Sequence, residues 1–249
     1  MSDSWWRDLP DLVSAASYFV YETWDRRDEM PQLLSLDIPA RHGLLEGLLR
    51  LPDMPESAAA EGPAMVALVC HPHPQGGGTM HTKVVFRVAQ ALVDVGMPTL
   101  RFNFRGVGRS TGTYDEGRGE GDDVRAALDF LVARYPTTPI CLAGFSFGSW
   151  VGLPIGCADA RVRQLVGVGV PVRLLAVDDL AECAKPKLIV QGAQDQYGPL
   201  DALQAWFARL EPPKQLRVIS GADHFFTQQQ QELAAAITSY FRTESPLRP

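Results

Sequence analysis

The feature that most constrains the fold is a regular alternation of short apolar runs with amphipathic segments of helix length. The apolar runs are four to seven residues long, which suits strands buried on both faces. A helix between successive strands returns the chain so that the strands run parallel. The alternation therefore predicts a mostly parallel sheet with helices on both faces. The predicted strands are 64–70, 99–103, 140–143, 164–170, 187–191 and 215–219. The helices predicted to follow them, in the same order, are 81–95, 121–134, 147–157, 178–184, 200–210 and 226–241.

Two further segments precede this alternation. Residues 33–38 and 44–51 can pair across 39–43 as an antiparallel hairpin at one edge of the sheet. We therefore expect one α/β domain over 33–249, preceded by a helical extension over 1–32. The extension either packs onto the domain or offers a membrane or partner surface, including a contact between copies of the chain. Its aromatic residues are Trp5, Trp6, Tyr18, Phe19, Tyr21 and Trp24.

Composition excludes several classes of protein. The net charge is −6 and the basic residues are scattered, so nothing favours binding to a nucleic acid. The longest apolar runs fall far short of the roughly 18–20 residues that span a bilayer. The N-terminus carries Asp3 and Asp8 and lacks the basic start of a secretory signal, which favours a cytoplasmic protein.

The four cysteines form no CxxC pair. Cys70 and Cys141 lie in apolar strands, where a thiol behaves as a small hydrophobic group. We expect these two, together with Cys157 and Cys183, to be reduced and structural.

The segment from Gly144 to Gly148 fits the pattern G-x-S-x-G between a predicted strand and a predicted helix. Glycines on both sides allow a turn too tight for β-carbons, and such a turn lifts the Ser146 hydroxyl above the strand end. The pattern also occurs by chance as a capped strand–helix turn. It predicts a nucleophile only if a general base and an orienting acid accompany it.

The base and the acid are found by their order along the chain. His224 follows the last predicted strand, and Asp195 follows the strand 187–191. The order serine, acid, histidine is the one expected in a sheet of this kind. Asp178 and Asp179 are the alternatives for the acid, and Asp223 is disfavoured because it adjoins the histidine.

Attack on a carbonyl also requires donors for the oxyanion. The Phe147 N–H, next to the serine, is the first predicted donor. The second is the His73 N–H, in the loop over 70–78. Prolines stiffen the backbone of this loop, and its glycines allow a ligand to approach the backbone closely.

Metal and nucleotide sites are weaker interpretations of the same chain. His71, His73 and His81 could be metal ligands, but no carboxylate lies at a matching spacing. The glycines over 106–112 miss the dinucleotide pattern by one residue, and 78–83 lacks the Gly-Lys pair of a phosphate-binding loop. We expect no cofactor and no metal.

Arg105 and Arg109 are expected to pair with acids such as Asp115 or Glu120.

With these residues in place, the chain resembles the α/β-hydrolase superfamily over roughly 33–243, in particular the small bacterial serine esterases without a lid. The blocks that carry the resemblance are HPHP at 71–74, NFRGVG at 103–108 and GEGDD at 119–123. The resemblance implies a carboxylic-ester hydrolase with Ser146, Asp195 and His224 as its triad and with no cofactor.

Too few residues separate the strands 164–170 and 187–191 to hold a cap domain. We therefore expect an open site that prefers short or medium acyl chains on a small-molecule ester. A thioesterase or peptidase with the same triad, or a non-catalytic binding protein on this fold, are the alternatives.

Overall fold

The computed structural model describes residues 33–53, 62–172 and 180–246. The expected extension over 1–32, the alternative acids Asp178 and Asp179, and part of the predicted helix 178–184 lie outside these residues. Leu180 is 3₁₀-helical and is followed by a turn and irregular backbone, so residues 180–184 contain no α-helix. Within the described ranges, we find no helix with the length and apolar character of a membrane span.

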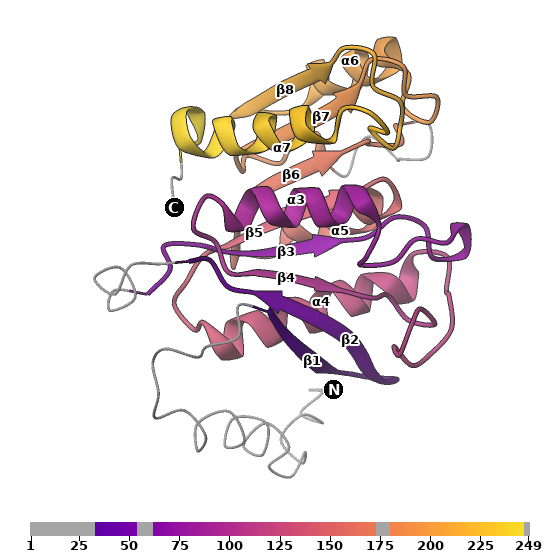
Figure 1. Cartoon of the computed structure of the whole chain (residues 1–249), viewed down its shortest axis with the longest axis vertical. Coiled ribbons are helices and arrows are strands. Elements are labelled where there is room, and N and C mark those ends of the chain that lie inside the picture. Colours follow the sequence, from indigo (N-terminus) through magenta and orange to yellow (C-terminus); the bar gives the residue numbers. More distant parts are fainter. Residues whose placement is uncertain (1–32, 54–61, 173–179, 247–249) are drawn as a thin grey trace. The chain divides into compact units, whose positions relative to one another are not determined.

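An eight-stranded sheet forms the centre of the domain, in the order β1-β2-β4-β3-β5-β6-β7-β8 (Figure 1). β1 and β2 form the expected antiparallel edge hairpin, β2 pairs antiparallel with β4, and the remaining pairs are parallel. The predicted α/β class is therefore confirmed. The strands are β1 (Leu33–Ala40), β2 (Gly43–Arg50), β3 (Val66–Cys70), β4 (Thr99–Phe102), β5 (Ile140–Phe145), β6 (Val162–Val168), β7 (Lys187–Gly192) and β8 (Lys214–Ile219).

Alternate residues of the central strands build two hydrophobic layers, one on each face of the sheet. In β3, Val66 and Leu68 join the layer under α4 and α5, whereas Ala67 and Val69 join the layer under α3 and α7. This follows from the two-residue period of a strand and explains why the central strands are apolar throughout. The helices are α3 (Lys83–Val93), α4 (Arg118–Arg134), α5 (Phe147–Ala158), α6 (Leu200–Arg209) and α7 (Gln230–Ser239).

The last helix begins later than its sequence pattern predicts. The pattern starts at Phe226, but Phe226 has a positive φ of 52° and α7 begins at Gln230. The intervening residues form a turn in which the Phe226 N–H donates to the Asp223 carbonyl. The buried Phe226 ring packs in the core under α7, so its apolar character reflects this turn rather than a helical face.

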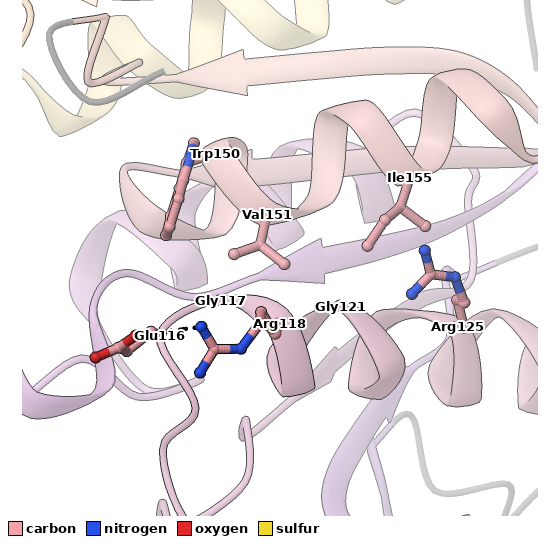
Figure 2. A pocket seen from close by; sticks show the side chains of 8 residues that line it. All are labelled: Glu116, Gly117, Arg118, Gly121, Arg125, Trp150, Val151 and Ile155. Atoms are coloured by element: carbon pink, nitrogen blue, oxygen red, sulfur yellow. Dashed lines mark hydrogen bonds and ion pairs between the residues drawn. The ribbon is translucent and has the colours of Figure 1, made fainter. Parts of the chain in front are cut away.

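A surface cavity of about 310 Å³ lies between α4 and α5. Val151 and Ile155 point from α5 toward α4, and Trp150 closes the end next to Gly117 (Figure 2). Arg118 and Arg125 line the cavity from α4, and each is already paired with an acid on its own segment. The cavity is thus lined by apolar side chains of α5 and by charged side chains that are paired with one another or with Asp115 and Asp122.

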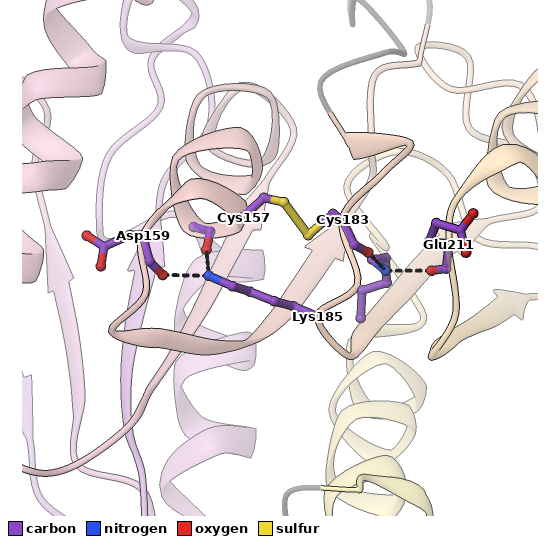
Figure 3. The surroundings of a disulfide bond; sticks show 7 residues. Cys157, Asp159, Cys183, Lys185 and Glu211 are labelled. Atoms are coloured by element: carbon purple, nitrogen blue, oxygen red, sulfur yellow. Dashed lines mark hydrogen bonds between the residues drawn. A yellow bond between two sulfur atoms is a disulfide. The ribbon is translucent and has the colours of Figure 1, made fainter.

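The expectation that all four cysteines are reduced is wrong for two of them. Cys157 near the end of α5 and Cys183 before β7 are joined by a disulfide, with Cα atoms 5.9 Å apart (Figure 3). Lys185 donates to the carbonyl of Asp159 beside this bond. Disulfides are typical of oxidising compartments, so the bond counts against the expected cytoplasmic location, which stays a prediction. Cys70 and Cys141 are free and buried, as expected.

Candidate active site

Ser146 occupies a strained turn between β5 and α5. Its φ of 54° and ψ of −119° are rare for a residue with a β-carbon. A β-carbon on Gly144 would lie 2.4 Å from the Gly148 carbonyl oxygen, and one on Gly148 would lie 2.4 Å from the Cys70 carbonyl oxygen. Both flanking glycines are therefore required, as the G-x-S-x-G pattern predicts, and the turn presents the serine at the carboxyl end of β5.

The loops after β5, β7 and β8 bring the three predicted side chains into one hydrogen-bonded chain. His224 Nδ1 lies 2.8 Å from Asp195 Oδ2, and His224 Nε2 lies 2.9 Å from Ser146 Oγ. A carboxylate only accepts, so Nδ1 carries the proton and Nε2 accepts from the serine hydroxyl. Asp195 and His224 are buried, whereas Ser146 is half-buried. This geometry can draw the proton from the Ser146 hydroxyl.

Four N–H donors surround the Asp195 carboxylate. The backbone N–H groups of Tyr197 and Gly198 donate to Oδ1, at 2.8 and 2.9 Å. Oδ2 accepts from His224 and, at 2.8 Å, from the amide of Gln191. The carboxylate is thus held in one orientation that aims it at the histidine.

Gln191 is a site residue that the sequence analysis did not identify. Its amide nitrogen also donates to the Gly198 carbonyl, and its amide oxygen accepts from the Val170 N–H at 2.9 Å. The side chain therefore ties the loop after β6 to the loop that carries Asp195. A signal was present in the sequence, since Gln191 is a polar residue that directly follows the apolar run Leu188–Val190 at the carboxyl end of β7; the structure shows that it is fully buried.

The side chains of the two residues that are predicted to supply oxyanion donors lie side by side. The rings of His73 and Phe147 are 4.9 Å apart, and the 70–78 loop packs against the turn at Gly148. Phe147 is the first residue of α5, so its N–H lacks a partner in the preceding turn. The Gln75 N–H donates to His73 Nδ1, which leaves Nε2 to donate to the Tyr114 hydroxyl at 3.1 Å. The His73 ring is fixed, while its role as an oxyanion donor stays a prediction.

His71 braces the same loop from within. The Phe104 N–H donates to its Nε2 at 3.0 Å, and its Nδ1 donates to the Pro72 carbonyl at 2.6 Å. Both ring nitrogens are therefore engaged, which leaves neither for a metal. Among the described residues, no group of three or more His, Cys, Asp or Glu side chains could hold a metal ion.

The burial of His71 makes the fold sensitive to acid. Burial lowers the pKa of His71 from 6.5 to about 4. As the pH falls below 6.5, the unfolded chain takes up a proton at His71 while the folded protein does not. Folding is therefore penalised between pH 6.5 and pH 4. We expect the free energy of unfolding of the wild type to fall by about 2 kcal/mol more between pH 7 and pH 5 than that of His71→Gln.

Urea unfolding at the two pH values measures this difference. His81→Gln, which replaces an exposed histidine, is measured alongside as the matched control. An identical pH dependence in His71→Gln and the wild type would contradict the prediction.

The expected acid partners of two arginines are wrong. Arg105 pairs with Asp123 at 2.7 Å, and Arg109 pairs with Asp37 and Glu46. Asp115 pairs instead with Arg118, and Glu120 accepts from the N–H groups of Asp115 and Gly117. Asp123 also accepts from His42 on the edge hairpin. The arginines thus brace neighbouring loops, as expected, but with partners that are distant in sequence.

Comparison with known proteins agrees with this architecture. The model of the alpha/beta hydrolase domain family matches residues 66–239. An uncharacterized protein of Rickettsia prowazekii is 38% identical over 189 residues, which are 72% of this chain and 79% of that protein.

Two solved structures are similar over nearly their whole length. An alpha-beta serine hydrolase homologue from Coxiella burnetii is 36% identical, with a TM-score of 0.78, and the match covers 87% of this chain and 100% of that one. A Xanthomonas campestris protein, described as a serine hydrolase without lid, is 32% identical, with a TM-score of 0.79 and coverage of 89% and 99%. The sheet order, the turn at Ser146 and these matches together show that the chain belongs to the alpha/beta hydrolase domain family.

Proposed function

We propose that the protein is a serine hydrolase that cleaves carboxylic esters of small molecules through an acyl-enzyme at Ser146. The observation that carries this proposal is the hydrogen-bonded chain from Ser146 through His224 to Asp195, built on a strained turn. A serine hydroxyl is a weak nucleophile at neutral pH, and a histidine held by a carboxylate is the arrangement that activates it.

The reaction has two steps. His224 takes the proton of Ser146 as its oxygen attacks the ester carbonyl, and the N–H groups of Phe147 and His73 stabilise the oxyanion. The C–O bond to the alcohol then breaks, and His224 gives its proton to the departing alcohol oxygen. Water, deprotonated by His224, attacks the acyl-enzyme and releases the acid. Asp195 keeps the proton of the imidazole on Nδ1 and stabilises its charged form.

An open site without a cap domain favours short or medium acyl chains. The chain passes from Val168 at the end of β6 to Lys187 at the start of β7 with too few residues for a cap. A series of p-nitrophenyl esters whose activity peaks at long acyl chains would contradict this preference. A thioesterase or peptidase would use the same residues, and substrate panels distinguish them.

A fluorophosphonate probe tests for an activated serine without assuming a substrate. We expect the intact mass of the wild type to gain a single adduct and that of Ser146→Ala to gain none. Ser239→Ala is the matched control, because Ser239 is exposed on α7, and it should be labelled like the wild type. Absence of an adduct on folded wild-type protein would contradict the proposal and favour a non-catalytic binding protein.

A further inference from the structure

Three aromatic rings surround the imidazole of His224. The Tyr197 ring lies 4.6 Å away, the Phe145 ring 5.1 Å and the Phe225 ring 5.2 Å. Phe145 is fully buried under the histidine, whereas Tyr197 is 49% and Phe225 is 47% exposed. Two aromatic rings thus face solvent beside the group that moves the proton.

This exposure is unusual in the described part of the chain. Only Leu33, Phe86, Tyr197, Val218 and Phe225 are large hydrophobic residues with exposed side chains there, and two of these five contact His224. Exposed apolar groups gathered at one point mark a binding surface more often than scattered ones do.

The reaction places one part of the substrate beside these rings. In the proposed mechanism, on which this inference rests, His224 Nε2 gives its proton to the departing alcohol oxygen. That oxygen must lie roughly 3 Å from Nε2 during the transfer. The carbon skeleton attached to that oxygen therefore lies within a few ångströms of the imidazole, close to the Tyr197 and Phe225 rings that contact it.

Hydrogen bonds close both loops that carry these rings. The Tyr197 N–H donates to Asp195, and the loop of Phe225 is closed by hydrogen bonds from the N–H and hydroxyl of Thr227 to Asp223. A loop held in this way loses little conformational entropy when the ring it carries packs against a ligand. The loops over 193–199 and 220–229 contain no lysine or arginine. Neither loop can therefore neutralise an anionic leaving group such as a phosphorylated carrier.

We propose that Tyr197 and Phe225 form the subsite for the alcohol portion of the ester, and that this subsite selects flat, uncharged, apolar alcohols. The selectivity comes from stacking and edge contacts with the two rings. Tyr197 and Phe225 are thus specificity-determining residues.

Matched acetate esters test the subsite. Benzyl acetate and ethyl acetate share one acyl group and have leaving alcohols of similar acidity, so their ratio of kcat/KM reports contacts with the alcohol portion. We expect Tyr197→Ala and Phe225→Ala each to lower this ratio by about three- to tenfold, and the double variant to lower it further. Tyr197→Phe keeps the ring and should keep the ratio.

Two controls complete the design. Phe86→Ala removes an exposed ring from α3 and should leave the ratio unchanged. Cyclohexylmethyl acetate, which is apolar but not flat, should depend less on the two rings than benzyl acetate. An equal dependence would overturn the preference for flat groups.

The failure of this subsite is distinguishable from the failure of the proposed function. Each variant is also treated with a small ethyl fluorophosphonate, whose labelling of Ser146 reports the activated serine alone. If the alanine variants are labelled at the wild-type rate and their benzyl-to-ethyl ratio of kcat/KM is unchanged, the proposed alcohol subsite is wrong. The proposed serine hydrolase activity is then unaffected. If the wild type is not labelled, the proposed serine hydrolase activity is itself wrong.

Discussion

Replacing His224 or Ser146 by alanine is expected to lower the kcat of ester hydrolysis by roughly 10⁴–10⁶-fold. The Ser146 hydroxyl donates to His224 Nε2 at 2.9 Å, and no other histidine is hydrogen-bonded to it in the described part of the chain. Without the imidazole, the hydroxyl keeps its proton. Without the hydroxyl, no acyl-enzyme forms. Removing either side chain should therefore lower kcat nearly as much as removing both.

Steady-state hydrolysis of p-nitrophenyl acetate measures the loss. His81→Ala and Ser239→Ala change exposed residues of the same types and should retain wild-type turnover. Circular dichroism and the unfolding transition establish that the inactive variants remain folded. Turnover above about one-hundredth of the wild-type value in His224→Ala would break the assignment of the general base.

Asp195→Asn is expected to lower kcat by roughly 10⁴-fold, because the amide reverses the hydrogen bond that sets the histidine tautomer. The Asp195 carboxylate accepts at Oδ1 from two backbone N–H groups and at Oδ2 from Gln191 and His224. An amide oxygen facing the backbone leaves its NH₂ group facing His224 Nδ1. The imidazole then accepts at Nδ1 and carries its proton on Nε2, where it cannot take the proton of Ser146.

The alternative acids from the sequence serve as the comparison. Asp178→Asn and Asp179→Asn should both retain wild-type turnover under the same conditions. A large loss of turnover in either of them, together with an active Asp195→Asn, would reassign the orienting acid. Fluorophosphonate labelling provides a second readout, since Asp195→Asn should slow the labelling of Ser146, whereas Asp178→Asn and Asp179→Asn should be labelled at the wild-type rate.

Local patterns made much of the domain predictable. The strands are recognised as short continuous apolar runs and the helices by their amphipathic period, and both patterns are visible over a few neighbouring residues. The turn at Ser146 was predictable for the same reason, since its two required glycines lie within two residues of the serine. Because parallel strands end at one edge of a sheet, the loops with Asp195 and His224 were also expected there.

Contacts between distant segments were not predictable from these patterns. The disulfide between Cys157 and Cys183 depends on how the end of α5 packs beside the segment before β7. The partner of Arg105 depends on how the first turns of α4 face the loop after β4. Neither the spacing nor the type of these residues identifies their partners.

The sequence by itself determined the order of the strands and helices, the strained turn at Ser146, and the three side chains proposed to act there. Only the tertiary structure decided what holds and surrounds those side chains. It decided that Gln191 ties Asp195 to the loop after β6, and that Tyr197 and Phe225 flank His224 with exposed rings. The physical reason is the distance along the sequence over which each effect acts. Backbone periodicity and steric limits act between residues that are neighbours in the sequence. Hydrogen bonds and ring contacts instead join whichever side chains the packed sheet brings within a few ångströms.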